Sequence, residues 1–323
     1  MFRKITDAIN RYNTFLITAH VRIDGDALGS ELALYHMLRQ MGKGAIVYNQ
    51  DETPSNYRFL PGADHVVHEL PSLGNVDGVF ILDCSELKRV GDEAEKIATA
   101  ANIINIDHHV SNGGFSQIRL IDPQASSTGE LLYRLAVHMG IAISGDVANC
   151  LYAAILTDTG CFRYGSTKKD TLIAAGNLVE KGADPQWISE NIYESSPLQK
   201  IMLLAKALET LSLEGGGRIG SLVVTQRSLR ETGALPEHTE GFVDLPRTIR
   251  GVEIAILYNE LADNQFKISL RSKGKVNVER VAKAFGGGGH VNAAACMIEG
   301  ELPDIRSRIL RVIEFGSERI SRG

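Results

Sequence analysis

The chain has 323 residues, of which 44% are hydrophobic and 23% are charged, a composition typical of a soluble globular protein with room for two domains. Its net charge of −5 at pH 7 argues against binding along long duplex nucleic acid, although a small anionic ligand remains compatible with it. No apolar stretch is long enough to cross a bilayer, and the first residues lack the apolar core of a signal peptide, so we expect no membrane association.

The cysteines carry information about the compartment. They are scattered along the chain without a Cys-x-x-Cys pair, at Cys84, Cys150, Cys161 and Cys296. A disulfide framework or a thiolate zinc site would need closer or paired spacing. We therefore expect reduced thiols and a cytoplasmic protein.

The first half of the chain alternates predicted strands with predicted helices. Apolar runs predict strands over 14–19, 45–48, 79–82 and 103–106, and helical spacing predicts helices over 2–12, 27–41, 93–101, 131–139, 146–156 and 170–181. Such alternation favours a doubly wound, mainly parallel sheet with helices packed on it.

Three of these strands end in a similar way. His20, Asp83 and Asp107 each follow an apolar run directly, and His108 and His109 come next after Asp107. The carboxyl edge of an open parallel sheet is where ligands bind. Taken alone, Asp107 and the two histidines could equally be a turn cap and two surface residues, but the repeated pattern favours a metal site.

Further metal-capable side chains lie in adjoining segments. Asp24 and Asp26 flank Gly25 at a helix start, where a capped helix would explain them if they stood alone. Asp158 follows the helix over 146–156, a place where a carboxylate is unfavourable unless a cation neutralises it. The candidate metal ligands are His20, Asp24, Asp26, Asp83, His108 and Asp158.

This ligand set suits particular ions. Carboxylates with two imidazoles and no thiolate fit Mn²⁺ better than Zn²⁺ or Cu⁺, and a carboxylate such as Asp83 can bridge two ions. Asp107 then holds an imidazole in position, and His109 faces the substrate. Ser127 and Thr128 open the next helix with capping-box spacing, which explains them structurally, although they could also face a ligand.

The second half predicts a smaller α/β domain. We expect a helical connector over 187–211, a boundary at Gly215–Gly217, strands over 219–224, 252–258 and 266–270, and helices over 278–285 and 306–315. Gly286–Gly289 and His290 lie between the helices. A glycine run lets backbone N–H groups approach a phosphate, and we expect a helix N-terminus after it to add a positive dipole. A flexible loop is the alternative.

These motifs, in this order, resemble those of the DHH phosphoesterases. The matching stretches are His20–Ser30, Asp83-Cys84-Ser85, Asp107-His108-His109 and Thr157-Asp158-Thr159-Gly160. The run Gly286–His290, with Arg271-Ser272 upstream, resembles the signature of the accompanying DHHA1 domain. Together the motifs resemble the oligoribonuclease/pAp phosphatase branch (pAp is 3'-phosphoadenosine 5'-phosphate).

The resemblance implies a division of labour. It implies a DHH domain over 1–188 with the two-metal site, a helical linker over 189–214, and a DHHA1 substrate-binding domain over 215–323, with the active site in the cleft between the domains. One Mn²⁺ would be held by His20, Asp24 and Asp83, and the other by Asp26, Asp83, His108 and Asp158, with Mg²⁺ or Co²⁺ as substitutes. The catalytic residues would be Asp83, Asp107 and His109, and the substrate-binding residues Arg271, Gly287, Gly288, Gly289 and His290.

The function implied is metal-dependent hydrolysis of short oligoribonucleotides from an end, and of pAp to AMP. The alternatives are a phosphodiesterase for pGpG or pApA, a RecJ-like exonuclease, a pyrophosphatase, and a nucleotide sensor that does not cut. The oligomeric state stays open, with a homodimer among the options. The family usually continues the glycine run with His-x-x-Ala-Ala-Gly, whereas this chain has Ala295 at the last position, which we expect to tighten the substrate pocket.

Overall fold

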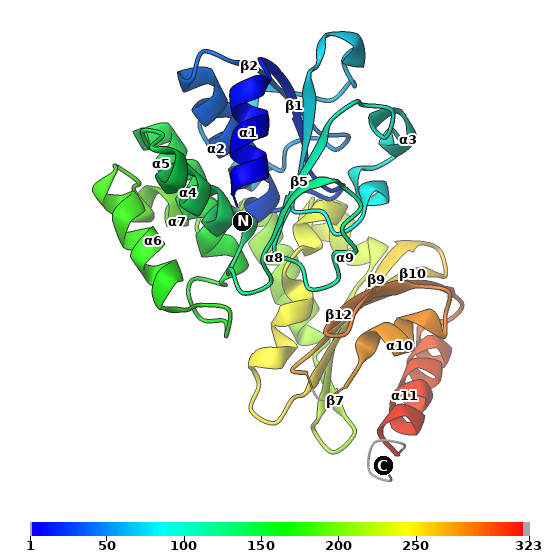
Figure 1. Ribbon diagram of the computed structural model, residues 1–323. Helices are drawn as coiled ribbons and strands as arrows, with labels where there is room; N and C mark the ends of the chain where they lie inside the picture. The colour runs from blue at the N-terminus through cyan, green and yellow to red at the C-terminus, as the bar shows by residue number, and fades with distance from the viewer. Residues whose placement is uncertain (1, 275, 319–323) are drawn as a thin grey trace. The chain divides into compact units, whose positions relative to one another are not determined.

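The computed structural model describes residues 2–274 and 276–318, and the chain forms two compact units, Met1–Ser195 and Ser196–Gly323 (Figure 1). Each unit has its own sheet. No helix in the described ranges has both the length and the apolar character needed to cross a membrane.

The first unit is a parallel sheet with helices packed on it. Its strands are β1 (Thr14–Thr18), β2 (Gly44–Tyr48), β3 (Val66–Val67), β4 (Gly78–Leu82), β5 (Ile103–Asp107) and β6 (Ile118–Ile121). Its helices are α1 (Arg3–Arg11), α2 (Gly25–Gln40), α3 (Ala94–Ile97), α4 (Thr128–Met139), α5 (Gly145–Asp158), α6 (Lys169–Glu180) and α7 (Pro185–Tyr193).

The strand order confirms the predicted doubly wound sheet. It is β3-β2-β1-β4-β5-β6, and every neighbouring pair is parallel. The order reverses between β1 and β4, and in such sheets ligands bind at the carboxyl ends of the strands next to the reversal. The short strands β3 and β6 were not predicted, and the helix expected over 93–101 shortens to α3.

Alternate side chains of the strands build the two cores of this unit. In β1, Phe15 and Ile17 pack with α1, α2, α4 and α5, whereas Leu16 points to the opposite face, where α3 lies. This alternation follows from the twofold repeat of a strand. Both faces of the sheet are therefore covered, and its carboxyl edge is the place where polar side chains can gather.

The second unit is a mixed sheet. Its elements are α8 (Leu198–Glu209), β7 (Ser212–Glu214), β8 (Ile219–Val224), α9 (Gln226–Thr232), β9 (Ile254–Ala262), β10 (Gln265–Ser272), α10 (Val278–Lys283), β11 (Gly288–His290), β12 (Ala293–Glu299) and α11 (Leu302–Glu318). The order is β11-β12-β10-β9-β8-β7, with β8 and β9 parallel and the other pairs antiparallel. Helices α10 and α11 cover one face, and α8 and α9 cover the other. The expected smaller α/β domain is confirmed.

One expectation for this unit is wrong. No helix follows the glycine run, because β11 and β12 form an antiparallel pair there and β12 also pairs with β10. The glycines serve this pairing: a Cβ on Gly287 would lie 2.2 Å from the carbonyl oxygen of Ala295, and Gly289 has φ +142°. Only glycine accepts both the close approach and that backbone conformation. Pairing with β10 thus makes residues 293–299 a strand, although their alanines have high helix propensity.

In the first unit, α2 packs closely against α5. A Cβ on Gly29 would lie 2.6 Å from the carbonyl oxygen of Cys150 and 3.0 Å from the Cβ of Ala154. Protein interiors are close-packed and do not yield easily to added atoms. The absence of a side chain at Gly29 therefore sets the distance between the two helices that carry Asp26 and Asp158.

We predict that Gly29→Ala lowers the free energy of unfolding by roughly 1–3 kcal/mol, because overpacking outweighs the gain of about 1 kcal/mol in helix propensity. Gly176→Ala in α6 is the matched control, since nothing lies within 4 Å of its added Cβ, and it should be neutral or stabilising. Urea unfolding of both variants measures the difference. Equal stability of the two variants would contradict the packing argument.

Candidate metal centre

The first group of candidate ligands lies where the strand order reverses. His20 follows β1 and Asp83 follows β4, and the Nε2 of His20 is 3.3 Å from the Oδ2 of Asp83. Asp24 caps α2 by accepting the backbone N–H of Ala27, and its Oδ2 is 3.7 Å from the same Nε2. Ligand atoms of His20, Asp24 and Asp83 all lie within 4.8 Å of one another, so this group could hold a metal ion.

The second group is built from two helices and the end of one strand, β5. The Nε2 of His108 lies 3.7 Å from Asp26 at the start of α2 and 3.4 Å from Asp158 at the end of α5. These three residues also meet the geometric condition for a metal site. The arrangement brings together the set that the sequence predicted, apart from Asp83.

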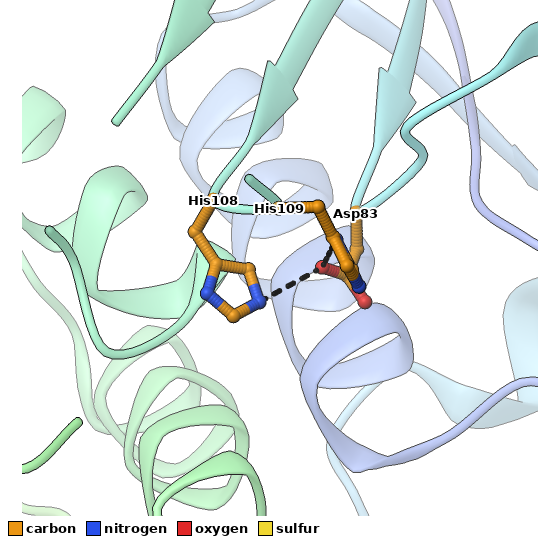
Figure 2. Close-up of side chains that lie close together, drawn as sticks. All are labelled: Asp83, His108 and His109. Atoms are coloured by element: carbon orange, nitrogen blue, oxygen red, sulfur yellow. Dashed lines mark ion pairs between the residues drawn. The ribbon is translucent and has the colours of Figure 1, made fainter. Parts of the chain in front are cut away.

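Asp83 lies between the two groups. Its Oδ2 faces His20, while its Oδ1 lies 3.5 Å from the Nε2 of His108 and 3.5 Å from the Nδ1 of His109 (Figure 2). Asp83 adopts φ +52°, a left-handed conformation that non-glycine residues rarely take. Such strain is found at functional sites, where the surroundings hold it in place. The turn after β4 thus points one carboxylate at both groups.

Asp107 orients His109, as the sequence predicted for one of the two imidazoles. The Oδ1 of Asp107 lies 2.7 Å from the Nδ1 of His109, and its Oδ2 accepts a hydrogen bond from Asn112 at 2.6 Å. Asp107 has no exposed surface. The pKa of Asp107 is low because these hydrogen bonds and the charge of His109 outweigh its burial. The carboxylate is therefore ionised and fixed against the imidazole.

Two asparagines that sequence reasoning missed support the turn at Asp83. Asn105 in β5 and Asn112 each donate a side-chain hydrogen bond to the carbonyl oxygen of Cys84, at 3.2 and 3.1 Å. Asn112 also donates to Asn105, at 2.9 Å. A sequence signal existed for Asn105, since it is the one polar residue within an apolar, β-branched run. Asn112 carried none, because the carbonyl of Cys84 that it binds belongs to a segment 28 residues earlier in the chain.

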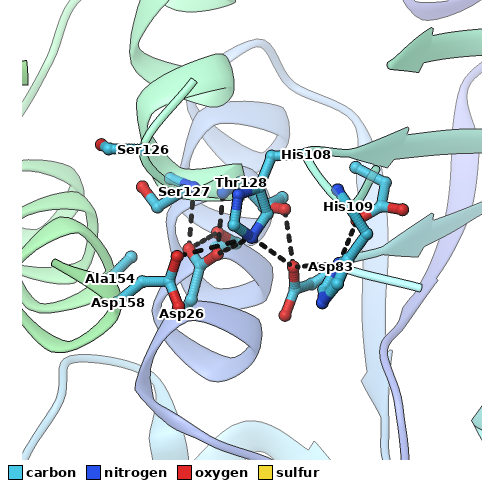
Figure 3. A network of polar contacts seen from close by, with 12 residues as sticks. Asp26, Asp83, His108, His109, Ser126, Ser127, Thr128, Ala154 and Asp158 are labelled. Carbon is cyan, nitrogen blue, oxygen red and sulfur yellow. Dashed lines mark hydrogen bonds and ion pairs between the residues drawn. The ribbon is translucent and has the colours of Figure 1, made fainter. Parts of the chain in front are cut away.

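Thr128 is a further residue whose role the sequence left open. Its hydroxyl donates to the Oδ1 of Asp83 at 3.0 Å, and its backbone N–H donates to Asp26 at 2.7 Å (Figure 3). Ser127, by contrast, caps α4 by accepting the N–H of Glu130, as the capping-box spacing predicts.

Charge in the site explains why cations fit it. Burial raises the pKa of Asp26 well above its ordinary value, and the charges of Asp83 and Asp158 raise it further. Burial likewise raises the pKa of Asp158 to about 6. Carboxylates packed this closely repel one another, and a bound dication removes the repulsion. The donor atoms, all carboxylate oxygens and imidazole nitrogens, suit a hard to borderline divalent ion.

For the histidines, burial and the neighbouring charges act on the pKa in opposite directions. Burial alone would lower the pKa of His20, but its hydrogen bond to Asp83 and the charge of Asp24 raise it to about 9. Burial also opposes the charge on His108, yet Asp83, Asp26 and Asp158 raise its pKa to about 10. In the absence of a metal, the neighbouring carboxylates thus favour the charged form of both imidazoles.

The predicted substrate-binding residues all lie in the second unit. Arg271 is in β10, where its side chain is partly exposed and its Nε is 4.0 Å from Asp244. Gly287 precedes β11, and Gly288, Gly289 and His290 form it. Ala295 is in β12 opposite Ser269 and Gly288, so the residue that departs from the family pattern belongs to the sheet.

The fold and the site define an α/β protein with carboxylate and histidine groups that could hold metal ions at the edge of its parallel sheet. Residues 14–155 match the model of the DHH family, N-terminal domain, and residues 220–314 match that of the DHHA1 domain. A curated relative is 31% identical over 95% of the chain. The chain therefore belongs to the DHH family and carries a DHHA1 domain, as the motifs indicated.

Similar proteins agree with this assignment. The relative at 31% identity, 90% of which is covered, is the bifunctional oligoribonuclease and PAP phosphatase NrnA of Thermus thermophilus. The protein of the same name from Bacillus subtilis is 26% identical over 92% of this chain and 93% of its own length. A crystal structure of an exopolyphosphatase-related protein from Bacteroides fragilis has a TM-score of 0.92 at 28% identity, covering 97% of this chain and 95% of that one.

We predict that the protein stripped of metal loses stability as the pH rises. The folded pKa of His20, about 9, exceeds the ordinary 6.5, so its contribution is fully present below pH 6.5 and is lost as the pH rises through 9. This loss is on the order of 3 kcal/mol for His20 alone. Urea unfolding in the presence of a chelator, between pH 6.5 and 9.5, measures it.

His20→Asn supplies the control, because it removes one titrating group and should make the pH dependence shallower, leaving the part that is due to His108. If the wild-type protein and this variant showed parallel curves, His20 would not carry the extra proton in the folded protein.

Proposed function

We propose that the chain is a metal-dependent phosphoesterase that hydrolyses short oligoribonucleotides from an end and converts pAp to AMP. The observation that carries the proposal is the position of Asp83, which belongs to the group with His20 and Asp24 and also lies 3.5 Å from His108 of the second group. The names of the relatives supply the substrate class. The chain covers at least nine tenths of both relatives, so the likeness extends over both units.

His20, Asp24 and Asp83 are proposed to hold one ion, and Asp26, Asp83, His108 and Asp158 the other. Mn²⁺ suits these donors, and Mg²⁺ and Co²⁺ are substitutes. When bound, divalent ions at such a site lower the pKa of a water molecule and stabilise charge that develops on a phosphoryl group. The strained turn at Asp83 and the hydrogen bonds from Asn105 and Asn112 to the next carbonyl keep the ligands in place.

His109 is the residue of this chain proposed to contact the phosphate beside the ions. Burial opposes its charged form, but its hydrogen bond to Asp107 and the charge of Asp83 raise its pKa. An imidazolium held by Asp107 can stabilise negative charge on a phosphoryl oxygen or give it a proton. Asp107 and Asp83 act in the same step, the first by orienting His109 and the second by holding ions.

The second unit is proposed to bind the nucleotide. Arg271 has the planar fork that pairs with phosphate in a bidentate manner, and its side chain is 33% exposed. The glycine segment 287–290 lies in the same sheet, one strand away from β10, because β12 pairs with both β11 and β10. We propose residues 1–188 as the catalytic domain, 189–214 as a helical linker and 215–323 as the substrate-binding domain.

The cytoplasm is the proposed location, and short RNA and small nucleotides are the proposed partners. The four cysteines are free, and three of them are buried, as expected for a reducing compartment. The net charge of −5 agrees with binding of short substrates held by a few local cations.

The direct test is activity after metal removal and return. Protein treated with a chelator should be inactive, and Mn²⁺ should restore cleavage of end-labelled RNAs of two to about twenty nucleotides, and of pAp. A product ladder favouring the shortest RNAs supports the proposal. Cleavage confined to long strands would favour a RecJ-like exonuclease, activity confined to pGpG or pApA a dinucleotide phosphodiesterase, and no cleavage with any divalent ion would contradict an enzymatic role.

We predict that His108→Ala and Arg271→Ala fail in different ways. His108→Ala removes a proposed metal ligand and should abolish turnover of every substrate. Arg271→Ala leaves the ligands intact and should lower kcat/KM for dinucleotides and pAp by about 30- to 150-fold, equivalent to roughly 2–3 kcal/mol for a lost charged hydrogen bond. A small nitrophenyl phosphodiester should be affected much less. Steady-state kinetics of both variants on both substrates measures the split.

Lys267→Ala is the matched control for Arg271→Ala, because Lys267 is an exposed cation four residues earlier in the same strand. It should leave kcat/KM within about twofold, since exposed charges of this kind contribute little. An Arg271→Ala protein that lost the small ester as completely as His108→Ala would place Arg271 in the catalytic centre or in the fold.

A further inference from the structure

We propose that Thr128 is a positioning residue that keeps the two proposed metal positions in register by holding Asp26 and Asp83 at once. This inference rests on the proposed function, because it concerns the ligands of the ions proposed there. Thr128 is the first residue of α4 and has no exposed surface. It comes from a segment separated from both carboxylates by more than 40 residues.

The contacts of Thr128 divide between its backbone and its side chain. Its backbone N–H donates to the Oδ2 of Asp26 at 2.7 Å, and the N–H of Gly129 donates to the Oδ1 at 2.9 Å. The hydroxyl of Thr128 donates to the Oδ1 of Asp83 at 3.0 Å (Figure 3). One residue therefore joins Asp26 of the second group to Asp83, which lies between the two groups.

The backbone part of this contact fixes the rotation of the Asp26 carboxylate. Each of its oxygens accepts one N–H from the first turn of α4, and Ser30 adds a hydroxyl at 3.2 Å. The helix N-terminus also favours the ionised carboxylate, against the burial that raises its pKa. Asp26 thus reaches the ion position with little freedom to turn.

The hydroxyl decides how the two oxygens of Asp83 are shared. It binds Oδ1, the oxygen that lies 3.5 Å from His108, while Oδ2 lies 3.3 Å from His20. A carboxylate that would serve two ions depends on the directions in which its oxygens are held. By fixing Oδ1, Thr128 sets the direction of Oδ2 as well.

This role is separate from the stability of α4. Ser127 caps the helix, so the hydroxyl of Thr128 is not needed for capping. Gly129 allows α4 to pack closely against α5, because a Cβ at this position would lie 2.5 Å from the Cβ of Ala154. Because neighbouring residues supply the cap and the packing, the Thr128 hydroxyl is left to bind Asp83.

The experiment compares Thr128→Val, which keeps the shape but loses the hydroxyl, with Thr128→Ser, which keeps the hydroxyl. Calorimetric titration of the chelator-treated full chain with Mn²⁺ measures affinity directly. We expect Thr128→Val to bind Mn²⁺ about 10- to 100-fold more weakly, the usual effect of losing a group that orients a metal ligand. Thr128→Ser should stay within about threefold of the wild-type protein, and kcat at saturating Mn²⁺ should follow the same order.

Thr171→Val is the matched control. The hydroxyl of Thr171 donates to Glu130 at 2.9 Å, so this variant also removes a buried threonine–carboxylate hydrogen bond, but from a carboxylate outside the ligand set. It should lower the melting temperature without changing Mn²⁺ affinity. Thr128→Ala repeats the test if Thr128→Val does not fold, and circular dichroism of the metal-free proteins checks folding.

Two results would overturn the inference alone: Mn²⁺ affinity of Thr128→Val equal to that of the wild-type protein, or affinity of Thr128→Ser as weak as that of Thr128→Val. An equal loss of affinity in Thr171→Val would do the same, because the effect would then be general loosening. A wild-type protein that bound no Mn²⁺ would overturn the proposed function, and the inference with it.

Discussion

The repulsion among carboxylates at the carboxyl edge of the parallel sheet is the constraint on which the first unit depends. Asp26 and Asp83 are almost fully buried, and Asp158 joins them through His108. Buried like charges are destabilising unless opposite charges or hydrogen bonds compensate them. The surrounding structure supplies both, with imidazoles on one side and the first turn of α4 on the other.

The imidazoles compensate the buried negative charge most strongly at Asp83. Burial would raise the pKa of this carboxyl, but hydrogen bonds to His108 and His20 hold the pKa well below its usual range. Its left-handed backbone is a strain of about 1–3 kcal/mol, which persists only where the neighbours determine it. The amides of Asn105 and Asn112 fix the following carbonyl and so hold the backbone in that conformation.

The sequence was most informative where local order decides the structure. His20, Asp83 and Asp107 follow their strands directly, so an apolar run that ends in a ligand was enough to place them at one edge. The alternation of strands with helices and the capped helix starts were also predictable, because neighbouring residues in the chain determine them.

The sequence pattern did not predict contacts between segments that are far apart in the chain. Asn112 and Thr128 resemble ordinary loop and helix-cap residues, and only the assembled sheet brings their donors to the carbonyl of Cys84 and to Asp83. The strand β12 was missed for a related reason. Its alanines have high helix propensity, and pairing with β10 and β11 overrides that preference.

The two groups of ligands are not equally supported, and this follows from the turn at Gly25. Asp24 and Asp26 flank that glycine, yet the side chain of Asp24 is 58% exposed, whereas that of Asp26 is 1% exposed. Asp24 is held by one backbone N–H of its own helix, and Asp26 by two from α4. A carboxylate fixed from another element loses less conformational entropy when it binds a ligand than one that is free to turn in solvent. The group formed with His108 is therefore the more preorganised, and the group formed with His20 and Asp24 is the one that has a ligand exposed to solvent.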